Sequence, residues 1–178
     1  MFQIQAKRIY LRDHLPADLQ DFHELLSNPQ VNRYLSVRSG SVDESGKRFE
    51  ECLLEANNSN RKKYFLAVCL NESHQIIGES GFTILDRYEK GGVAEIGYFL
   101  KPAFWGFGYA QEIAAALINA CFTTMNFDKV TATCDSRNAA SAKVMQKCGM
   151  TLEQSVKSHY PDGEDFLQLE FSIKRHPE

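Results

Sequence analysis

The stretch GYFLKPAFWGFGYA, residues 97–110, constrains the fold of this chain more than any other stretch. Its first residues are typical of a strand, Pro102 interrupts that strand, and a helix is expected from Tyr109 onward. Gly106 and Gly108 stand two residues apart in the turn between the strand and the helix, so side chains leave the backbone of this turn uncovered. The stretch therefore predicts a strand that enters a helix through a glycine turn.

Such a turn can direct several backbone N–H groups into one concavity, and the start of the following helix adds its own unpaired N–H groups. The positive end of the helix dipole further attracts a negatively charged group. This combination suits a phosphate or pyrophosphate. The alternative is a tight turn that needs glycine only for its backbone angles, and the local sequence leaves both interpretations open.

Hydrophobic periodicity predicts a single mixed α/β domain over residues 1–178. Apolar positions at helical spacing predict helices over residues 16–27, 42–57, 109–126 and 139–148, with a short helical turn at 31–35. Strands are expected over residues 2–11, 63–70, 75–86, 93–100, 129–134, 151–159 and 165–174. Residues 36–46 and 87–92 are expected to be a loop and a polar turn.

The composition is that of a soluble globular protein, with 43% hydrophobic and 24% charged residues. The net charge of −3 gives no indication of nucleic-acid binding. No apolar run reaches the length of a membrane span, and residues 1–12 do not resemble a signal peptide. We therefore expect a cytoplasmic protein that contacts neither nucleic acid nor membrane.

The five cysteines are odd in number and form no CxxC pair, so we expect reduced thiols in the core. The five histidines show no ligand spacing with them, and the sequence predicts no metal site.

The glycine turn resembles motif A of the GNAT acetyltransferases, in which Gln or Arg precedes two residues, Gly, one residue, and Gly or Ala. Gly108 and Ala110 match the last two positions, and Trp105 stands where Gln or Arg is usual. The W-G-x-G-Y-A form is similar to that of the RimJ/RimL-type branch, which acetylates protein N-termini and other amines. The resemblance implies that this turn holds the pyrophosphate of acetyl-coenzyme A, with Trp105 packed over Gly106, Phe107, Gly108, Tyr109 and Ala110.

The resemblance extends along nearly the whole chain. It implies one GNAT-like domain with a mixed, mostly antiparallel sheet of about seven strands, flanked by about four helices. In that family the early helices form one wall of the acceptor-substrate site, which makes Tyr34 and Arg38 candidate substrate contacts. The alternative for both residues is a solvated loop.

Asn138 and Ser141 open a predicted helix, where such residues are most often caps. With the residues that follow they give N-x-x-S-x-x-x-x-x-K-x-G-M, which resembles motif B of the family. The resemblance implies that Asn138 hydrogen-bonds the pantetheine arm. Met145 stands where many members have a tyrosine that protonates the leaving thiolate, and the RimJ/RimL-type pattern assigns Ser141 to the sulfur instead.

Glu95 is the candidate base that takes a proton from the acceptor amine, directly or through water; its alternative is an exposed strand carboxylate or an ion-pair partner. Asp135 and Tyr160 are weaker candidates, each expected to serve a turn or the core.

The backbone of Tyr98, Phe99 and Leu100 is expected beside the pantetheine arm. There an exposed N–H can bind the thioester oxyanion; the alternative is ordinary sheet pairing.

These assignments predict an N-acetyltransferase that moves the acetyl group of acetyl-coenzyme A to a primary amine by direct attack in a ternary complex. The favoured acceptor is a ribosomal or other protein N-terminus, since its α-amine is more often neutral at pH 7 than a lysine. A small-molecule acceptor, such as a polyamine or an aminoglycoside, and a non-catalytic acyl-coenzyme A-binding module are the alternatives. The sequence leaves monomer and homodimer equally open.

Overall fold

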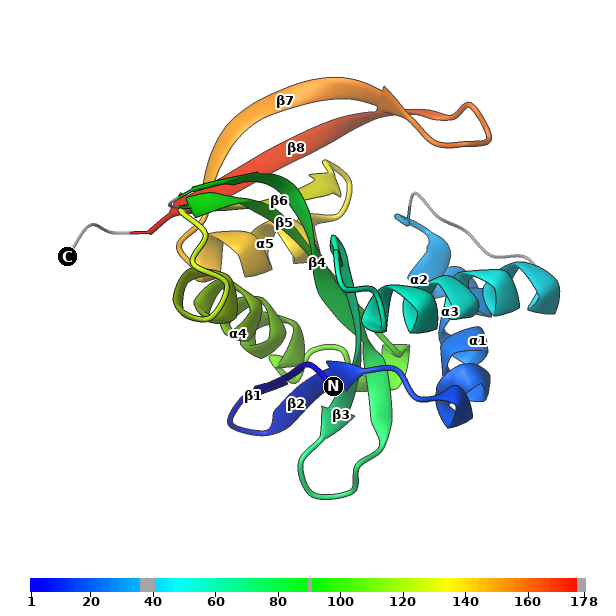
Figure 1. Cartoon of the computed structure of the whole chain (residues 1–178). Helices are drawn as coiled ribbons and strands as arrows, with labels where there is room; N and C mark the ends of the chain where they lie inside the picture. Colours follow the sequence, from blue (N-terminus) through cyan, green and yellow to red (C-terminus); the bar gives the residue numbers. More distant parts are fainter. Residues whose placement is uncertain (36–40, 90, 176–178) are drawn as a thin grey trace.

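The computed structural model of the chain describes residues 1–35, 41–89 and 91–175 (Figure 1). The N-terminal half begins with two short strands, continues through three helices and returns as a long hairpin. Its elements are β1 (Gln3–Gln5), β2 (Ile9–Asp13), the 3-10 helix η1 (Pro16–Asp18), α1 (Leu19–Ser27), α2 (Pro29–Asn32), α3 (Val42–Ala56), β3 (Lys63–Leu70) and β4 (Ile76–Tyr88).

The C-terminal half alternates strands and helices before it ends in a second hairpin. Its elements are β5 (Gly91–Leu100), the 3-10 helix η2 (Pro102–Phe104), α4 (Tyr109–Thr123), β6 (Lys129–Asp135), α5 (Ala139–Lys147), β7 (Thr151–His159) and β8 (Asp165–Lys174).

The strands form one sheet in the order β1-β2-β3-β4-β5-β6-β8-β7. Neighbouring strands are antiparallel except β5 and β6, which run parallel. The β5–β6 ladder joins residues 93–95 to residues 129–131, although β5 continues to Leu100 and β6 to Asp135. The two strands therefore separate after Glu95 and Thr131, and the edge of β5 beyond that point faces an opening in the sheet.

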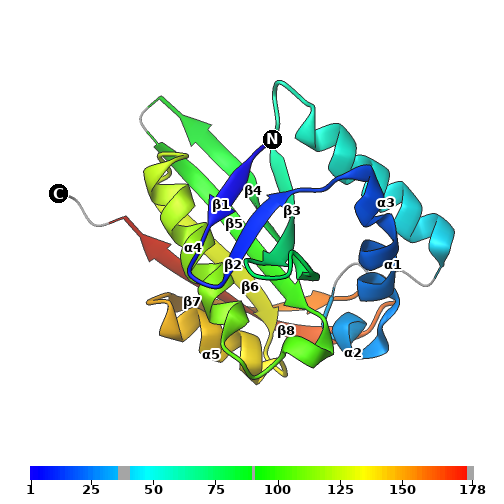
Figure 2. The same ribbon diagram turned by 90° about the horizontal axis from the view of Figure 1, so that it is seen from below.

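Helices cover both faces of the sheet: α4 and α5 lie on one side and α1 to α3 on the other (Figures 1 and 2). On the first side, Ile113 and Leu117 of α4 belong to the main core and are fully buried. On the second side, a smaller cluster is made by Phe22 and Leu26 of α1 with Phe49 and Cys52 of α3. Full burial of a large apolar side chain contributes about 1.5–3 kcal/mol, so these contacts hold the helices to the sheet.

The predicted single mixed α/β domain is confirmed, although the described residues contain eight strands and five α-helices instead of about seven and about four. The additional strand arises because residues 2–11 turn back on themselves, where the N–H of Ala6 donates to the carbonyl of Ile9 at 2.9 Å. The additional helix is the four-residue α2, which the sequence predicted as a turn. The predicted polar turn at residues 87–92 is wrong over most of its length, since β4 runs to Tyr88 and β5 begins at Gly91.

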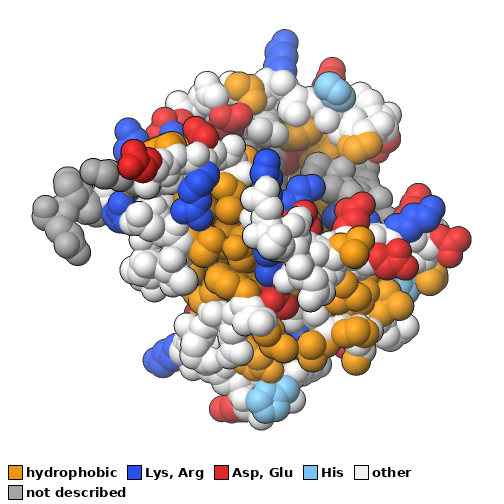
Figure 3. Space-filling view, viewed as in Figure 1, with side chains coloured by type: hydrophobic (Ala, Val, Ile, Leu, Met, Phe, Trp, Pro, Cys, Tyr) orange, Lys and Arg blue, Asp and Glu red, His pale blue; other side chains and the backbone are white. Residues whose placement is uncertain are grey.

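On the face shown in Figure 3, Lys and Arg side chains are mixed with Asp and Glu, in keeping with the net charge of −3. No helix in the described part of the chain combines the length and apolar character needed to cross a membrane.

Candidate active site

The turn between β5 and α4 depends on glycine for its backbone conformation. Gly106 and Gly108 both have φ of +81°, a region that residues with a side chain rarely adopt. A Cβ at Gly106 would meet nothing within 4 Å, so backbone angle and not crowding requires glycine there. Gly108 is the N-cap of α4 and supplies no side-chain cap. The first N–H groups of α4 are therefore available to an acceptor from outside the helix.

Contacts from both sides hold this turn. The indole Nε1 of Trp105 donates to the carbonyl of Leu100 at 2.8 Å, which ties the turn back to the end of β5. The side chain of Phe107 is 64% exposed, and its carbonyl accepts a hydrogen bond from Nη1 of Arg8 at 3.0 Å.

Arg8, from the turn between β1 and β2, also anchors the first turn of α4. Its guanidinium lies 4.4 Å from the ring centroid of Tyr109, and its Nε lies 2.7 Å from a carboxylate oxygen of Glu112. The contact with Phe107 spans 99 residues of sequence, so no local sequence pattern predicts it.

A cleft of about 450 Å³ lies between this turn, the end of β5 and α5. Phe107 does not line it, because its side chain points to solvent. Lys143 and Lys147, one turn apart on α5, bring positive charge to the cleft. In the sequence, Lys147 is recognisable only as part of a motif, and no pattern indicates Lys143. The predicted cofactor-binding residues that line the cleft are Tyr98, Phe99, Leu100, Trp105, Gly106, Gly108, Tyr109, Ala110, Asn138 and Ser141.

A second cavity, of about 290 Å³, lies where β5 and β6 separate. Glu95 of β5, Thr133 and Asp135 of β6, and Arg48 of α3 are among its lining residues. The hydroxyl of Thr133 donates to a carboxylate oxygen of Glu95 at 3.0 Å, which orients the carboxylate at the strand separation. Glu95 therefore faces a different cavity from the glycine turn.

The two cavities meet at a common wall. Tyr34, predicted as a substrate contact, belongs to this wall, whereas Arg38 lies outside the described residues. The residues that line both cavities are Tyr34, Leu35, Tyr98, Phe99, Asn138 and Ser141. Molecules bound in the two cavities would thus approach each other beside Ser141 and the backbone of β5.

Asn138 and Ser141 have different roles at the start of α5. Asn138 is the helix cap, because its Oδ1 accepts a hydrogen bond from the backbone N–H of Ser141 at 3.2 Å. The hydroxyl of Ser141 lies instead 3.4 Å from the phenol oxygen of Tyr98. Burial raises the pKa of Tyr98 to about 12, although the hydrogen bond with Ser141 acts in the opposite direction. The phenol is therefore protonated at neutral pH and can donate, a property of Tyr98 that the sequence analysis missed.

Cys134 also borders Ser141 in the second cavity. Burial, followed by the negative charge of Asp135, raises its pKa to about 11. The thiol is therefore protonated at neutral pH and is a weak nucleophile. None of the five cysteines, all within the described part of the chain, forms a disulfide.

Asp135 and Tyr160 are engaged with each other and with Arg137. The carboxylate of Asp135 accepts from the phenol of Tyr160 at 2.8 Å and from Arg137 at 2.6 Å. Burial alone would raise the pKa of Asp135, but the hydrogen bonds from Arg137 and Tyr160 outweigh it and lower the pKa to about 2. This carboxylate is a structural ion-pair partner, whereas that of Glu95 is held by one hydroxyl.

The fold and the paired cavities define a domain that can hold two small groups side by side, and the family follows from the sequence match. Residues 8–151 match the model of the acetyltransferase (GNAT) domain. The chain therefore belongs to the GNAT acetyltransferase family, and the expected family and acyltransferase class are confirmed. It is 28% identical over 163 residues to the uncharacterized N-acetyltransferase YnaD of Bacillus subtilis (strain 168), covering 92% of this chain and 91% of that protein.

Solved structures share the whole fold. An acetyl transferase from Salmonella typhimurium that modifies the N-terminal serine of 50S ribosomal subunit protein L7/L12 superposes with a TM-score of 0.83 at 19% identity, over 98% of this chain and 100% of that one. Spermidine N-acetyltransferase from Vibrio cholerae, in complex with CoA and spermine, gives 0.79 at 18% identity, over 94% and 95%. At these identities the likeness establishes the fold, and acetyl-coenzyme A is the cosubstrate that the family implies.

Proposed function

We propose that this protein transfers the acetyl group of acetyl-coenzyme A to the α-amine of a protein N-terminus, by direct attack while both substrates are bound. The observation that carries the proposal is the meeting of the two cavities at Tyr98, Phe99, Asn138 and Ser141. One cavity has the groups that suit a phosphate-bearing thioester, and the other contains a carboxylate that can accept a proton. Holding two reactants side by side can by itself supply a large part of the rate enhancement.

In the first cavity, the open N–H groups at the start of α4 suit the pyrophosphate of acetyl-coenzyme A. Lys143 and Lys147 add positive charge for its phosphate groups. Asn138 uses its side-chain oxygen as the helix cap, so its N–H groups are the part of the side chain that can donate to the pantetheine arm. The edge of β5 beyond Glu95 is separated from β6 and offers backbone groups to that arm and to the thioester carbonyl.

In the second cavity, Glu95 is the proposed base. The amine nitrogen attacks the thioester carbonyl carbon, and the proton that it loses passes to Glu95, directly or through water. Its hydrogen bond from Thr133 leaves the carboxylate able to accept this proton. Asp135 is less suited to the task, because Arg137 and Tyr160 stabilise its ionised form.

When the carbon–sulfur bond breaks, its electron pair leaves with the sulfur. Ser141 is the proposed donor to the developing thiolate, and the phenol of Tyr98 beside it can donate in turn to the Ser141 hydroxyl. A thiolate is a fair leaving group, since a thiol pKa is close to 8.5, so this assistance lowers the barrier without being indispensable. The high pKa of Cys134 argues against a covalent acetyl-cysteine intermediate.

The charges around the acceptor cavity favour an N-terminal amine over a polyamine. Asp135 is already paired with Arg137, and Arg48 is among the residues that line the cavity, so a substrate with several positive charges would meet a cation as well as the carboxylate of Glu95. An α-amine carries at most one charge and is followed by peptide groups that can accept hydrogen bonds from arginine.

The proposal is tested by following coenzyme A release from acetyl-coenzyme A with a panel of N-terminal peptides, spermidine, spermine and aminoglycosides. We expect release that depends on a peptide bearing a free α-amine, and none with the same peptide N-terminally blocked. Faster turnover of spermidine than of every peptide would move the assignment to a polyamine acceptor. Binding of acetyl-coenzyme A without release in the presence of any amine would favour a non-catalytic binding module.

A further inference from the structure

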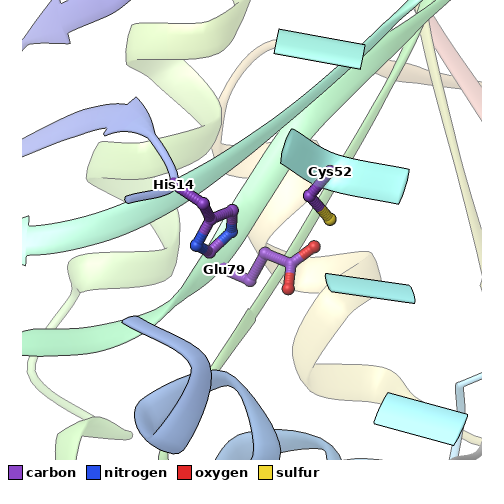
Figure 4. A group of neighbouring side chains, drawn as sticks. All are labelled: His14, Cys52 and Glu79. Atoms are coloured by element: carbon purple, nitrogen blue, oxygen red, sulfur yellow. The ribbon is translucent and has the colours of Figure 1, made fainter. Parts of the chain in front are cut away.

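Three potential metal ligands from distant parts of the sequence meet beneath α3, on the face of the sheet opposite α4 and α5. His14 directly follows β2, Cys52 belongs to α3 and Glu79 belongs to β4. Figure 4 shows the three side chains converging on one point. One ligand atom from each lies within 4.8 Å of the others. His14, Cys52 and Glu79 are respectively 5%, 3% and 5% exposed, so the cluster is buried.

Polar atoms of this cluster lack the hydrogen bonds that buried groups normally have. Within the described residues, three of these atoms have no hydrogen-bond partner: Nδ1 and Nε2 of His14 and Oε2 of Glu79. Most buried polar side-chain atoms in proteins are paired, and exceptions call for an explanation. The imidazole is held edge-on by Phe22 and Phe49, each with its ring centroid 5.4 Å away, so apolar neighbours fix its orientation.

The carboxylate of Asp18 lies on the far side of the imidazole. Its Nδ1 lies 3.7 Å from a carboxylate oxygen of Asp18, and Arg12 fixes that carboxylate with contacts of 2.6 and 3.1 Å. The Nδ1 contact is longer than a hydrogen bond, but it places the Asp18 carboxylate on the side of the ring away from Cys52 and Glu79. One ring nitrogen of His14 is directed toward Glu79 in Figure 4, and the contact between Nδ1 and Asp18 leaves Nε2 as that nitrogen.

We propose that His14, Cys52 and Glu79 form a structural Zn²⁺-binding site that fastens α3 to the sheet. Imidazole nitrogen, thiolate sulfur and carboxylate oxygen are the three ligand types that zinc takes in proteins, whereas Mg²⁺ and Ca²⁺ prefer oxygen alone. One thiolate and one carboxylate balance the two charges of the ion, so the buried site is neutral overall. Tetrahedral zinc places its ligand atoms ~3.3–3.8 Å apart. The three atoms lie within 4.8 Å of one another, so they would have to draw closer on binding, and a ligand from outside these three residues would fill the fourth position.

The site is separate from the reaction, because none of the three residues lines either cavity. It does lie behind the acceptor cavity. Glu79 is paired in the β4–β5 ladder with Phe99, and Arg48, one helical turn before Cys52 on α3, lines the cavity. The ion would therefore stiffen one wall of the acceptor site without contacting a substrate. The sequence predicted no metal site, because the spacing of positions 14, 52 and 79 carries no ligand pattern.

The test uses the full-length protein. Zinc is measured in the purified protein, the metal is removed with a chelator, and the protein is equilibrated with Co²⁺. We expect about one zinc per chain after equilibration with Zn²⁺. We also expect a thiolate-to-cobalt charge-transfer band in the near ultraviolet, which reports directly on a sulfur ligand. If the parent protein shows no such band and binds no zinc, the proposal is overturned. The three side chains are then a buried polar cluster without a metal.

The matched variants are Cys52→Ala and Cys121→Ala. Both remove a buried thiol from a helix, but Cys121 lies on α4, on the opposite side of the sheet. Loss of the band and at least tenfold weaker zinc binding are expected for Cys52→Ala and Glu79→Gln, with the parent's behaviour retained by Cys121→Ala. A zinc-induced rise in Tm of equal size in Cys52→Ala and the parent would show binding elsewhere on the molecule and contradict the site.

Discussion

Replacement of Ser141 with alanine separates the catalytic role of this residue from a structural one. The structure assigns the helix cap to Asn138, whose side chain accepts from the N–H of Ser141 at 3.2 Å, and that bond survives in Ser141→Ala. The hydroxyl that is lost lies 3.4 Å from the phenol oxygen of Tyr98, longer than the ~2.5–3.0 Å of a good O–H···O hydrogen bond. The free energy of unfolding should therefore fall by less than about 0.5 kcal/mol.

The kinetic effect should be larger than the effect on stability. If the Ser141 hydroxyl donates to the leaving thiolate, its loss removes an interaction made in the transition state, which lowers kcat and leaves the KM for acetyl-coenzyme A nearly unchanged. General acid–base assistance contributes ~10²–10⁴-fold, and the low end applies because the thiolate leaves readily. We expect kcat to fall roughly tenfold to a hundredfold, or about 1.4–2.8 kcal/mol.

The assay compares kcat, KM and Tm for Ser141→Ala, Asn138→Ala and Tyr98→Phe. Asn138→Ala removes the cap, so it should cost about 1 kcal/mol of stability, lower Tm by about 2–4 °C and raise the KM for acetyl-coenzyme A. If Tyr98 acts through Ser141, adding Tyr98→Phe to Ser141→Ala should lower kcat little further. Full activity of Ser141→Ala together with a lowered Tm would refute the reasoning.

Three other variants test separate parts of the protein. Glu95→Gln should lower kcat about tenfold to a hundredfold, most strongly at pH below the amine pKa, with normal cofactor affinity; a pH–rate profile that overlays the parent's would return Glu95 to a structural role. The double variant Lys143→Ala with Lys147→Ala should bind coenzyme A several-fold more weakly at low salt, and the difference should shrink at ~1 M salt; equal affinity by calorimetry would contradict it. The folded pKa of Asp135, about 2, lies below its unfolded value of 3.8, so its stabilisation is present above pH 4 and lost as the pH falls toward 2. Asp135→Asn should accordingly cost on the order of 2 kcal/mol near pH 7 and less at pH 3 by denaturant unfolding; a cost that does not change with pH would argue against the ion pair.

Local sequence patterns predicted the elements whose character is set locally. The near-continuous apolar run of residues 63–70 forms β3, in which Leu66, Ala67, Val68 and Cys69 are fully buried. Helices α4 and α5 begin at the predicted residues, because the glycine turn and the Asn cap are local signals. The last two residues of β4, Arg87 and Tyr88, were missed, because they are exposed and pair with Gly92 and Gly91 of β5, which no local pattern signals.

The contacts that complete the site could not be predicted, because they depend on which elements pack together. The hydrogen bond from Arg8 to Phe107 joins residues 99 positions apart, and the contact of Tyr98 with Ser141 joins residues 43 positions apart. Periodicity indicates that these side chains lie on buried or exposed faces, but it does not identify their partners. The resemblance in the sequence supplied the roles of Asn138 and Ser141, and the structure added the phenol of Tyr98 beside them.

The central claim, that acetyl transfer occurs directly between two substrates held in adjoining cavities, is tested most directly by initial rates. The concentrations of acetyl-coenzyme A and of the best peptide acceptor are varied together, and reciprocal rates are plotted against reciprocal concentration. Direct transfer in a ternary complex predicts lines that intersect. Parallel lines, accompanied by an acetylated enzyme in mass spectra taken without acceptor, would show a covalent intermediate and contradict the account.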